Sequence, residues 1–335
     1  MSNFDNIIKD IKNKKYQPVY FLAGDEAFFI DRISKTIEDE VLNEDEKSFD
    51  QSVLYGNEIT VEQLISEAKQ FPMFSSKRVV VIKEAQHLSR GIEKIESYLE
   101  NPQPETILVV NYKGKKPDGR LKFTKILSKN GWLHEFPAVR EYQIPAYIEN
   151  FSKAAGLAVD PKSKAMITES LGSDLGRVYN EIQKLKIVVK DGKITPEIVE
   201  QNIGISKDYN NFELQKAIGE KDALKAFKIS GYFGQDPKRN PLVVTITILH
   251  SFFVKLIAYH ATTDKSSKSL AKELGIAEFL LTDYHIAAKN YPLKKVTKII
   301  SMLRDTDIKS KGVGMTGRVS DSELLSELIA KIINA

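Results

Sequence analysis

The sequence predicts an α/β domain followed by two all-helical regions. Up to Arg140, short runs of Val, Ile and Leu alternate with stretches in which apolar residues recur every three or four positions. Nearly continuous apolar runs are typical of strands buried on both faces of a parallel sheet, and the stretches between them of amphipathic helices. After Glu141 only the helical spacing continues. We expect a parallel sheet with flanking helices in residues 1–140, a small helical region in 141–208 and an all-helical region in 209–335.

The first region contains five predicted strands and four predicted helices. Thr60 is placed to cap the second helix, with Gln63 three residues later as in a capping box. The strands are expected at Val19–Ala23, Ser52–Tyr55, Val79–Ile82, Ile107–Val110 and Trp132–Phe136, and the helices at Phe28–Leu42, Val61–Gln70, Ile92–Leu99 and Leu121–Ser128.

The remaining sequence predicts helices only. Pro161 and Pro196 stand where a first-turn proline belongs, and the polar segment Ser206–Asn211 separates the two helical regions. The expected helices are Ile144–Ala155, Pro161–Leu171, Asp174–Val189, Thr195–Ile203, Phe212–Gly219, Ala223–Phe233, Pro241–His260, Leu270–Gly275, Glu278–Asn290, Pro292–Lys309 and Asp321–Ile333.

Composition excludes several classes of site. The 335 residues include no cysteine, which excludes disulfides, thiolate metal sites and cysteine nucleophiles and fits a reducing cytoplasm. The first residues carry Asp5 and Asp10 and do not resemble a signal peptide. No run is predicted to approach the ~20 apolar residues that a membrane helix needs, so we expect no membrane association.

Charge is distributed unevenly along the chain. Residues 1–210 hold 30 Lys and Arg against 32 Asp and Glu, whereas residues 211–335 hold 19 against 13. Two interpretations of the basic C-terminal third stay open. It is either an ordinary solvated helical face or a surface for nucleic acid or another acidic partner.

A nucleotide site is the first function to test in such a chain, and its chemistry is missing. A phosphate-binding loop after the first strand needs a second glycine and a lysine. Here the segment is Gly24-Asp25-Glu26-Ala27-Phe28-Phe29-Ile30-Asp31, with two acids where phosphate would lie. The third strand is followed by Lys83-Glu84 where a magnesium-binding acidic pair would be expected. We predict no catalytic residue and no cofactor.

Two other features carry little chemistry. The run Gly312-Val313-Gly314-Met315-Thr316-Gly317-Arg318-Val319 matches a dinucleotide fingerprint but follows a predicted helix rather than a strand. We interpret it as a helix connection whose neighbours Lys309, Lys311 and Arg318 are candidate DNA contacts. The five histidines are scattered without metal-ligand spacing, so no metal site is predicted.

One short connection is unusually apolar. Between the second helix and the third strand lies Phe71-Pro72-Met73-Phe74, in which Pro72 ends the helix. Either these side chains plug the end of the sheet, or they form a hydrophobic wedge for the pocket of a partner. Burying one such side chain is worth about 1.5–3 kcal/mol, so three of them would supply several kcal/mol of binding free energy.

Taken together, these segments resemble the delta subunit family of the bacterial DNA polymerase III clamp loader. The resemblance extends in order over nearly the whole chain. It is carried by Val19–Glu26 with Phe28, Asp31 and Arg32; Phe71–Ser75 before Arg78–Val81; Pro102–Thr106; Gly172–Leu175 with Asn180, Glu181, Lys184 and Leu185; Asn211–Leu214; Leu270–Gly275; and Asp307–Ser310.

The resemblance implies a degenerate AAA+ module that does not hydrolyse nucleotide, a helical lid and a C-terminal collar. It implies that Phe71, Pro72, Met73 and Phe74 bind the ring-shaped sliding clamp (the beta subunit) and open one ring interface during replication. The implied partners are the ATPase and delta-prime type subunits of a heteropentamer, with primed DNA reached through the complex, in a cytoplasmic, nucleoid-associated replisome. Arg177 stands near the lid's nucleotide-sensing motif at a displaced spacing, and Asn111 ends the fourth strand where a polar sensor is often placed.

The sequence leaves two alternatives to a clamp-opening subunit open. An active AAA+ ATPase would bind nucleotide despite the altered Gly24–Asp31 loop. An AAA+-like DNA-binding scaffold without a clamp partner would bind DNA through residues 211–335 with a steep salt dependence.

Overall fold

The computed structural model describes residues 3–88, 91–276, 278–313 and 319–335. The chain divides into two compact units, 1–139 and 140–335. The first holds a five-stranded parallel sheet in the order β2-β3-β4-β1-β5. The strands are β1 (Val19–Gly24), β2 (Gln51–Tyr55), β3 (Arg78–Lys83), β4 (Thr106–Lys113) and β5 (Leu133–Glu135). All five predicted strands are therefore present.

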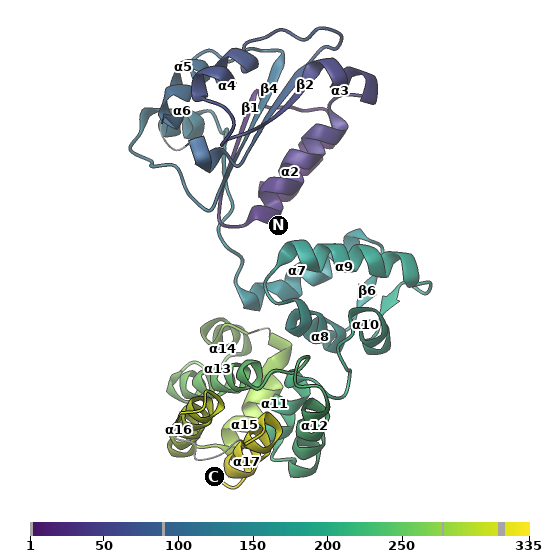
Figure 1. Cartoon of the computed structure of the whole chain (residues 1–335), viewed down its shortest axis with the longest axis vertical. Coiled ribbons are helices and arrows are strands. Elements are labelled where there is room, and N and C mark those ends of the chain that lie inside the picture. The colour runs from purple at the N-terminus through teal and green to yellow at the C-terminus, as the bar shows by residue number, and fades with distance from the viewer. Residues whose placement is uncertain (1–2, 89–90, 277, 314–318) are drawn as a thin grey trace. The chain divides into compact units, whose positions relative to one another are not determined.

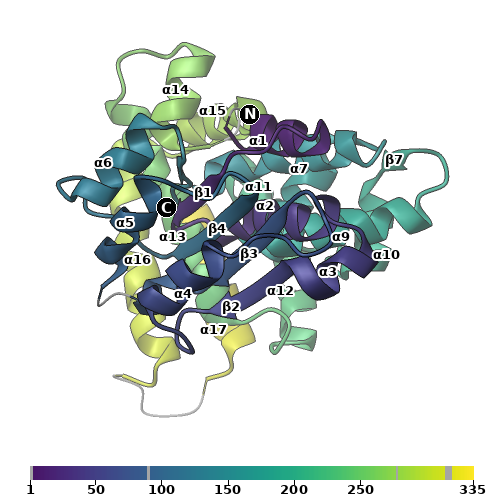
Figure 2. The same ribbon diagram turned by 90° about the horizontal axis from the view of Figure 1, so that it is seen from above.

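Helices cover both faces of this sheet (Figure 1). Helix α2 packs on one face, and α4, α5 and α6 lie on the other, over a core that includes Phe21, Val80 and Leu108. Figure 2 shows β2, β3, β4 and β1 side by side. The helices of the unit are α1 (Asn3–Lys12), α2 (Ala27–Glu40), α3 (Glu44–Asp50), α4 (Val61–Ala68), α5 (Glu96–Leu99) and α6 (Lys122–Lys129), with 3₁₀ turns at Ala85–Leu88 and Ile92–Ile95.

Local signals account for several of these boundaries. The capping box predicted for α4 is present, since Thr60 Oγ1 accepts the N–H of Gln63 at 3.3 Å and Gln63 Oε1 accepts the N–H of Thr60 at 2.8 Å. A second box at Asn43 and Glu46 begins α3, a helix that the sequence analysis did not predict. The predicted helix Ile92–Leu99 is a 3₁₀ turn followed by the single α-turn of α5.

The second unit is helical apart from two very short strands. Strands β6 (Ala158–Val159) and β7 (Lys193–Ile194) pair in parallel, which corrects the expectation that strands stop after Glu141. Two residues are too few to produce a periodicity. The helices are α7 (Ile144–Ala154), α8 (Pro161–Leu171), α9 (Leu175–Val188), α10 (Pro196–Ile203), α11 (Asn211–Glu220), α12 (Ala223–Gln235), α13 (Leu242–Ala261), α14 (Ser267–Leu274), α15 (Leu281–Asn290), α16 (Leu293–Ser310) and α17 (Asp321–Ile333), with 3₁₀ turns at Glu141–Gln143 and Glu278–Leu280.

Helix α13 departs from an expectation. By length and composition alone it could cross a membrane, although the sequence analysis expected no run of that kind. Its buried residues, among them Leu249, Phe252 and Leu256, belong to the core shared by α11–α17, and it packs against α15 and α16. The apolar character of α13 is thus explained by its place in a helical core.

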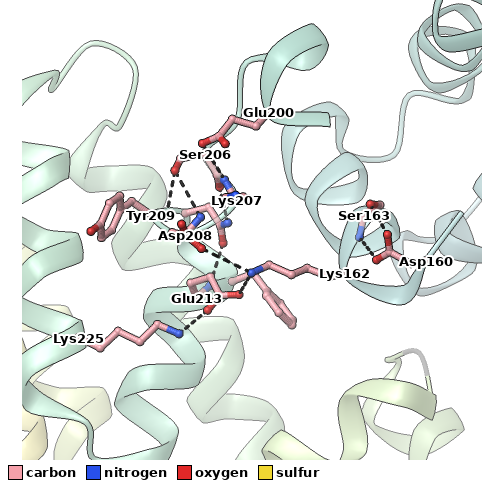
Figure 3. Close-up of polar contacts among 12 residues, drawn as sticks. Asp160, Lys162, Ser163, Glu200, Ser206, Lys207, Asp208, Tyr209, Glu213 and Lys225 are labelled. Atoms are coloured by element: carbon pink, nitrogen blue, oxygen red, sulfur yellow. Dashed lines mark hydrogen bonds and ion pairs between the residues drawn. The ribbon is translucent and has the colours of Figure 1, made fainter. Parts of the chain in front are cut away.

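Helix α8 contacts the start of α11 through buried and half-buried charges. The Glu169 carboxylate accepts the backbone N–H groups of Asn211 (2.6 Å) and Phe212 (3.0 Å), which are free donors in the first turn of α11. Figure 3 shows Lys162 reaching Glu213 at 3.0 Å, with Lys225 of α12 on the other carboxylate oxygen. The two helical regions on either side of Ser206–Asn211 are joined by these contacts.

Candidate functional site

The turn after β1 is closely packed and contains a carboxylate at the start of α2. Gly24 has φ +126°, and a Cβ there would lie 2.1 Å from the carbonyl oxygen of Phe136, so no side chain fits. Glu26 precedes α2, and its carboxylate accepts the N–H of Phe28 at 3.4 Å and the N–H of Val139 at 3.4 Å. A helix N-terminus attracts anions, and this one already holds a carboxylate of the chain itself.

The cations at the same edge of the sheet are also paired. Lys83 Nζ lies 3.2 Å from Glu38, and Lys113 Nζ lies 2.8 Å from both Asp31 and Glu84. The hydrogen bond from Lys113 is the main cause of the lowered pKa of Glu84. Lys83 and Lys113, at the ends of β3 and β4, are therefore both paired with carboxylates.

Asn111 lies inside β4, two residues before Lys113, and does not end the strand as the sequence suggested, because β4 continues to Lys113. Its side chain is fully buried, and neither its amide nitrogen nor its amide oxygen has a hydrogen-bond partner in the described part of the chain. The buried amide of Asn111 is therefore without a hydrogen-bond partner among the described residues, and we assign it no catalytic role.

The histidines make structural contacts. His134 is buried, its Nε2 lies 2.9 Å from Gln17 Oε1, and burial lowers the pKa of its imidazole to about 4. His260 and His285 contact the Tyr291 carbonyl and the Tyr259 hydroxyl. Among the residues that the structure describes, no group of three or more His, Asp or Glu side chains could hold a metal ion.

The segment Phe71-Pro72-Met73-Phe74, called here the apolar loop, is exposed. The exposed fractions are 70% for Phe71, 71% for Met73 and 66% for Phe74, while Pro72 is half-buried. These side chains do not plug the end of the sheet, which was one of the two interpretations of the sequence. Large apolar side chains gathered on one exposed loop are the usual mark of an interaction site.

The backbone of the apolar loop is held by a buried carboxylate. Asp50, the last residue of α3, is fully buried and accepts the N–H groups of Met73 (2.5 Å), Phe74 (2.9 Å) and Ser75 (2.8 Å). Burial by itself raises the pKa of Asp50, but the three backbone donors outweigh it and hold the pKa below its usual value. The carboxylate thus fixes the turn that presents Met73 and Phe74.

An ion pair fixes the first residue of β3, which lies next to the apolar loop. The Arg78 guanidinium is buried and binds Glu67 of α4, Ser52 Oγ at 3.3 Å and the carbonyl of Phe49 at 3.4 Å. Because Glu67 and Arg78 lie on either side of the apolar loop in sequence, their pairing closes its base.

A fourth side chain belongs to the same surface. Phe49 of α3 is 52% exposed, and its ring centroid lies 4.4 Å from that of Phe74. We call Phe49, Phe71, Met73 and Phe74 the apolar patch. The sequence analysis missed both Phe49 and Asp50. A signal for Phe49 existed, since it is the one large apolar residue in the otherwise polar helix Glu44–Asp50.

The predicted DNA contacts near the C-terminus are only partly described. Lys309 Nζ lies 3.6 Å from Glu327, and Lys311 Nζ lies 2.6 Å from Asp307. Residues 314–318 of the glycine motif, Arg318 among them, lie outside the described residues, while Gly312 has φ +79° just after α16. The two described lysines therefore already have acidic partners.

Comparisons with known proteins agree with the fold and the sequence pattern. The family model described as DNA polymerase III, delta subunit, matches residues 20–136. The chain is 25% identical over 336 residues to DNA polymerase III subunit delta of Bacillus subtilis (strain 168), covering 96% of this chain and 94% of the relative. This confirms the resemblance to the delta-subunit family.

A solved structure agrees with the fold of the delta family. The Bacillus subtilis DNA clamp loader delta protein matches with a TM-score of 0.59 and 22% identity, covering 99% of this chain and 100% of that one. The predicted fold class, a parallel α/β module with flanking helices followed by helical regions, is confirmed. The similarity of the chain to a delta-type clamp-loader subunit of DNA replication holds from end to end.

Proposed function

We propose that this chain is a non-hydrolysing clamp-loader subunit that binds a ring-shaped sliding clamp through the apolar patch and opens one interface of the ring. The observation that carries the proposal is an exposed group of large apolar side chains on a loop whose backbone is fixed by Asp50. A preorganised loop loses little conformational entropy on binding, so more of its burial energy is left for affinity.

The opening step requires differential binding. A ligand shifts a conformational equilibrium only by the difference between its affinities for the two states. The apolar patch and its surroundings must therefore fit the opened clamp better than the closed ring. The turn after β1 holds a carboxylate in place of phosphate, so we assign nucleotide hydrolysis to neighbouring ATPase subunits.

The rest of the chain serves assembly in this proposal. Residues 1–140 form the AAA+-like module, residues 141–208 the lid and residues 209–335 a collar that holds the chain in a cytoplasmic heteropentamer with ATPase and delta-prime type subunits. The core formed by α11–α17 lies within residues 214–332, which supports a collar with its own core. Primed DNA is reached through the complex. Of the contacts that the sequence suggested, Lys309 and Lys311 already have acidic partners, and Arg318 lies outside the described residues.

Titration calorimetry with the sliding clamp of the same organism tests the proposal. We expect tight binding by the wild-type chain and a loss of about 2 kcal/mol or more for each of Phe71→Ala, Met73→Ala and Phe74→Ala. The matched control is the double variant Ile187→Ala, Leu224→Ala, which removes side chains that are 84% and 70% exposed elsewhere. The control should bind as the wild type does.

Each result has a defined meaning. Equal losses in the control and in the three single variants would show that the patch is not the contact. Absence of binding by the wild type would favour the DNA-binding scaffold. Saturable ATP binding at millimolar concentration would favour the ATPase.

A further inference from the structure

A stretch of the C-terminal region carries positive charge only. Between Asp283 and Asp305 there is no acidic residue, and the stretch contains Lys289, Lys294, Lys295, Lys298 and Arg304. Lys289 lies in the last turn of α15, and the next three lysines lie in the first two turns of α16. The basic excess of residues 211–335 is therefore concentrated around one helix start.

Three of these lysines share one exposed side of α16. Lys294 and Lys298 are four positions apart and Lys295 and Lys298 three apart, so their side chains are neighbours on the helix surface. All three are exposed, whereas Val296 and Ile299 of the same turns are buried in the helical core. The helix thus turns its lysines to solvent and its apolar side to α13 and α17.

Lys221 brings a fourth cation to this side. It ends α11 with a left-handed backbone, donates to the Ile333 carbonyl at 3.1 Å and lies 5.0 Å from the centre of the Tyr291 ring. Burial lowers the pKa of Lys221, and the charge of Lys295 lowers it further, as expected of two nearby cations.

The lysines of α16 are not neutralised within the chain. Across the described residues, Lys294, Lys295 and Lys298 have no carboxylate within 4.0 Å, in contrast to Lys309, Lys311 and Lys331, which pair with Glu327 or Asp307. The first turn of α16 also contains no acid, although acids are what the dipole favours there. Cations in this position repel one another and oppose the helix dipole, so an anionic ligand bound there would relieve the repulsion.

We propose that Lys221, Lys294, Lys295 and Lys298 form a surface that binds the phosphate backbone of nucleic acid without sequence preference. Leu293 is the one exposed large apolar residue between Lys289 and Lys298, so the surface lacks the apolar centre that a protein interface needs. Free lysines without a base-reading partner favour backbone contacts. The proposal moves the direct DNA contact from Lys309 and Lys311 to the start of α16, and it does not depend on clamp binding.

The test compares two full-length variants that lose the same charge. Lys294→Gln, Lys295→Gln, Lys298→Gln removes the free lysines, and Lys309→Gln, Lys311→Gln, Lys331→Gln removes lysines that have acidic partners. Fluorescence anisotropy with labelled single-stranded and duplex oligonucleotides, at about 50 to 200 mM salt, gives the affinity and its salt dependence. Circular dichroism confirms that both variants fold.

We expect the first variant to bind at least tenfold more weakly at low salt, with a salt slope smaller by about two to three because each lost phosphate contact removes about 0.7 to 0.9. The paired-lysine variant should change affinity less than threefold. The proposal is overturned if the wild type shows no salt-dependent binding, or if both variants lose equally. It is also overturned if polyglutamate displaces the oligonucleotide at equal charge concentration, which would indicate an acidic protein partner instead.

Discussion

The carboxylate of Asp50 accepts the backbone N–H of Phe74 at 2.9 Å, across 24 positions of sequence. The same carboxylate accepts the N–H groups of Met73 and Ser75, so one buried side chain determines the shape of the exposed apolar loop. Asp50 is itself buried, so it shapes the exposed loop without forming part of the exposed surface. Replacing Asp50 therefore changes the order of the loop backbone and leaves the apolar side chains of the loop in place.

Replacing Asp50 by Asn should destabilise the chain and weaken clamp binding together. An amide offers one acceptor oxygen and brings two donors to a buried position, so at least one loop N–H loses its partner at a cost of about 1–3 kcal/mol. Urea unfolding and clamp calorimetry measure the two effects. Asp45→Asn, at an exposed position of the same helix, is the matched control. A clamp affinity unaffected by D50N would disconnect the loop geometry from binding.

The order of the apolar loop should also depend on pH and should decrease in acid. The pKa of Asp50 is lowered in the folded chain, so its contribution to stability is present above the unfolded value of about 3.9 and is lost as the pH falls through the lower folded value. Hydrogen exchange of the Met73, Phe74 and Ser75 amides measures this directly. We expect these amides to lose protection in that acidic range in the wild type, and to be poorly protected at every pH in the D50N variant.

Phe49 should contribute to the same contact as Phe74. Its ring packs on that of Phe74 and stays half exposed, so Phe49→Ala removes both a contact surface and a support for its neighbour. We expect clamp affinity to fall five- to tenfold, which corresponds to about 1–1.4 kcal/mol, with little change in the unfolding free energy. Leu224→Ala, at an exposed site of the second unit, is the control. If F49A and the wild type bind the clamp with equal affinity, Phe49 is not part of the contact, and only the apolar loop is.

Stability should fall between acidic and neutral pH because of Glu169. Burial raises the pKa of this carboxyl to about 7, the charge of Glu213 raises it too, and the N–H groups of Phe212 and Asn211 oppose the shift. Because the folded pKa of Glu169 lies above its unfolded value, protonated Glu169 adds to the unfolding free energy. This contribution is roughly 3 kcal/mol at most; it is fully present below about pH 4.5 and is lost as the pH rises to 7. Unfolding free energies of the wild type and Glu169→Gln at several pH values test this. Parallel pH profiles would contradict it.

Asn111 should be replaceable at a gain in stability. Its buried amide has no hydrogen-bond partner among the described residues, and burying such a group costs about 1–3 kcal/mol. Leucine has the same branched skeleton of heavy atoms and no polar group, so Asn111→Leu is expected to raise the unfolding free energy by about 1 kcal/mol. Val109→Ala in the same strand is the control: it removes buried apolar atoms and should lower the unfolding free energy. A loss of stability in N111L would contradict this prediction.

The sequence by itself determined the order and nature of most elements. Buried strands such as β3 and β4 are continuous Val, Ile and Leu runs, and the capping box at Thr60 is a local pattern, so both are readable from neighbouring residues. The altered turn at Gly24 and the apolar composition of Phe71–Phe74 are likewise local. The two-residue strands β6 and β7 and the short helix α3 were not predicted, because they are too short to establish a period of apolar residues.

Only the tertiary structure decided which of these residues act together. Asp50 holds a loop more than twenty positions away, and Lys309 has an acidic partner on α17 whereas Lys298 has none in the described part of the chain. Exposure, pairing and shared surfaces depend on what the packing of distant segments brings within a few ångströms. Periodicity reports which side of an element is apolar, but the free energy of a charge or a loop depends on its neighbours in space.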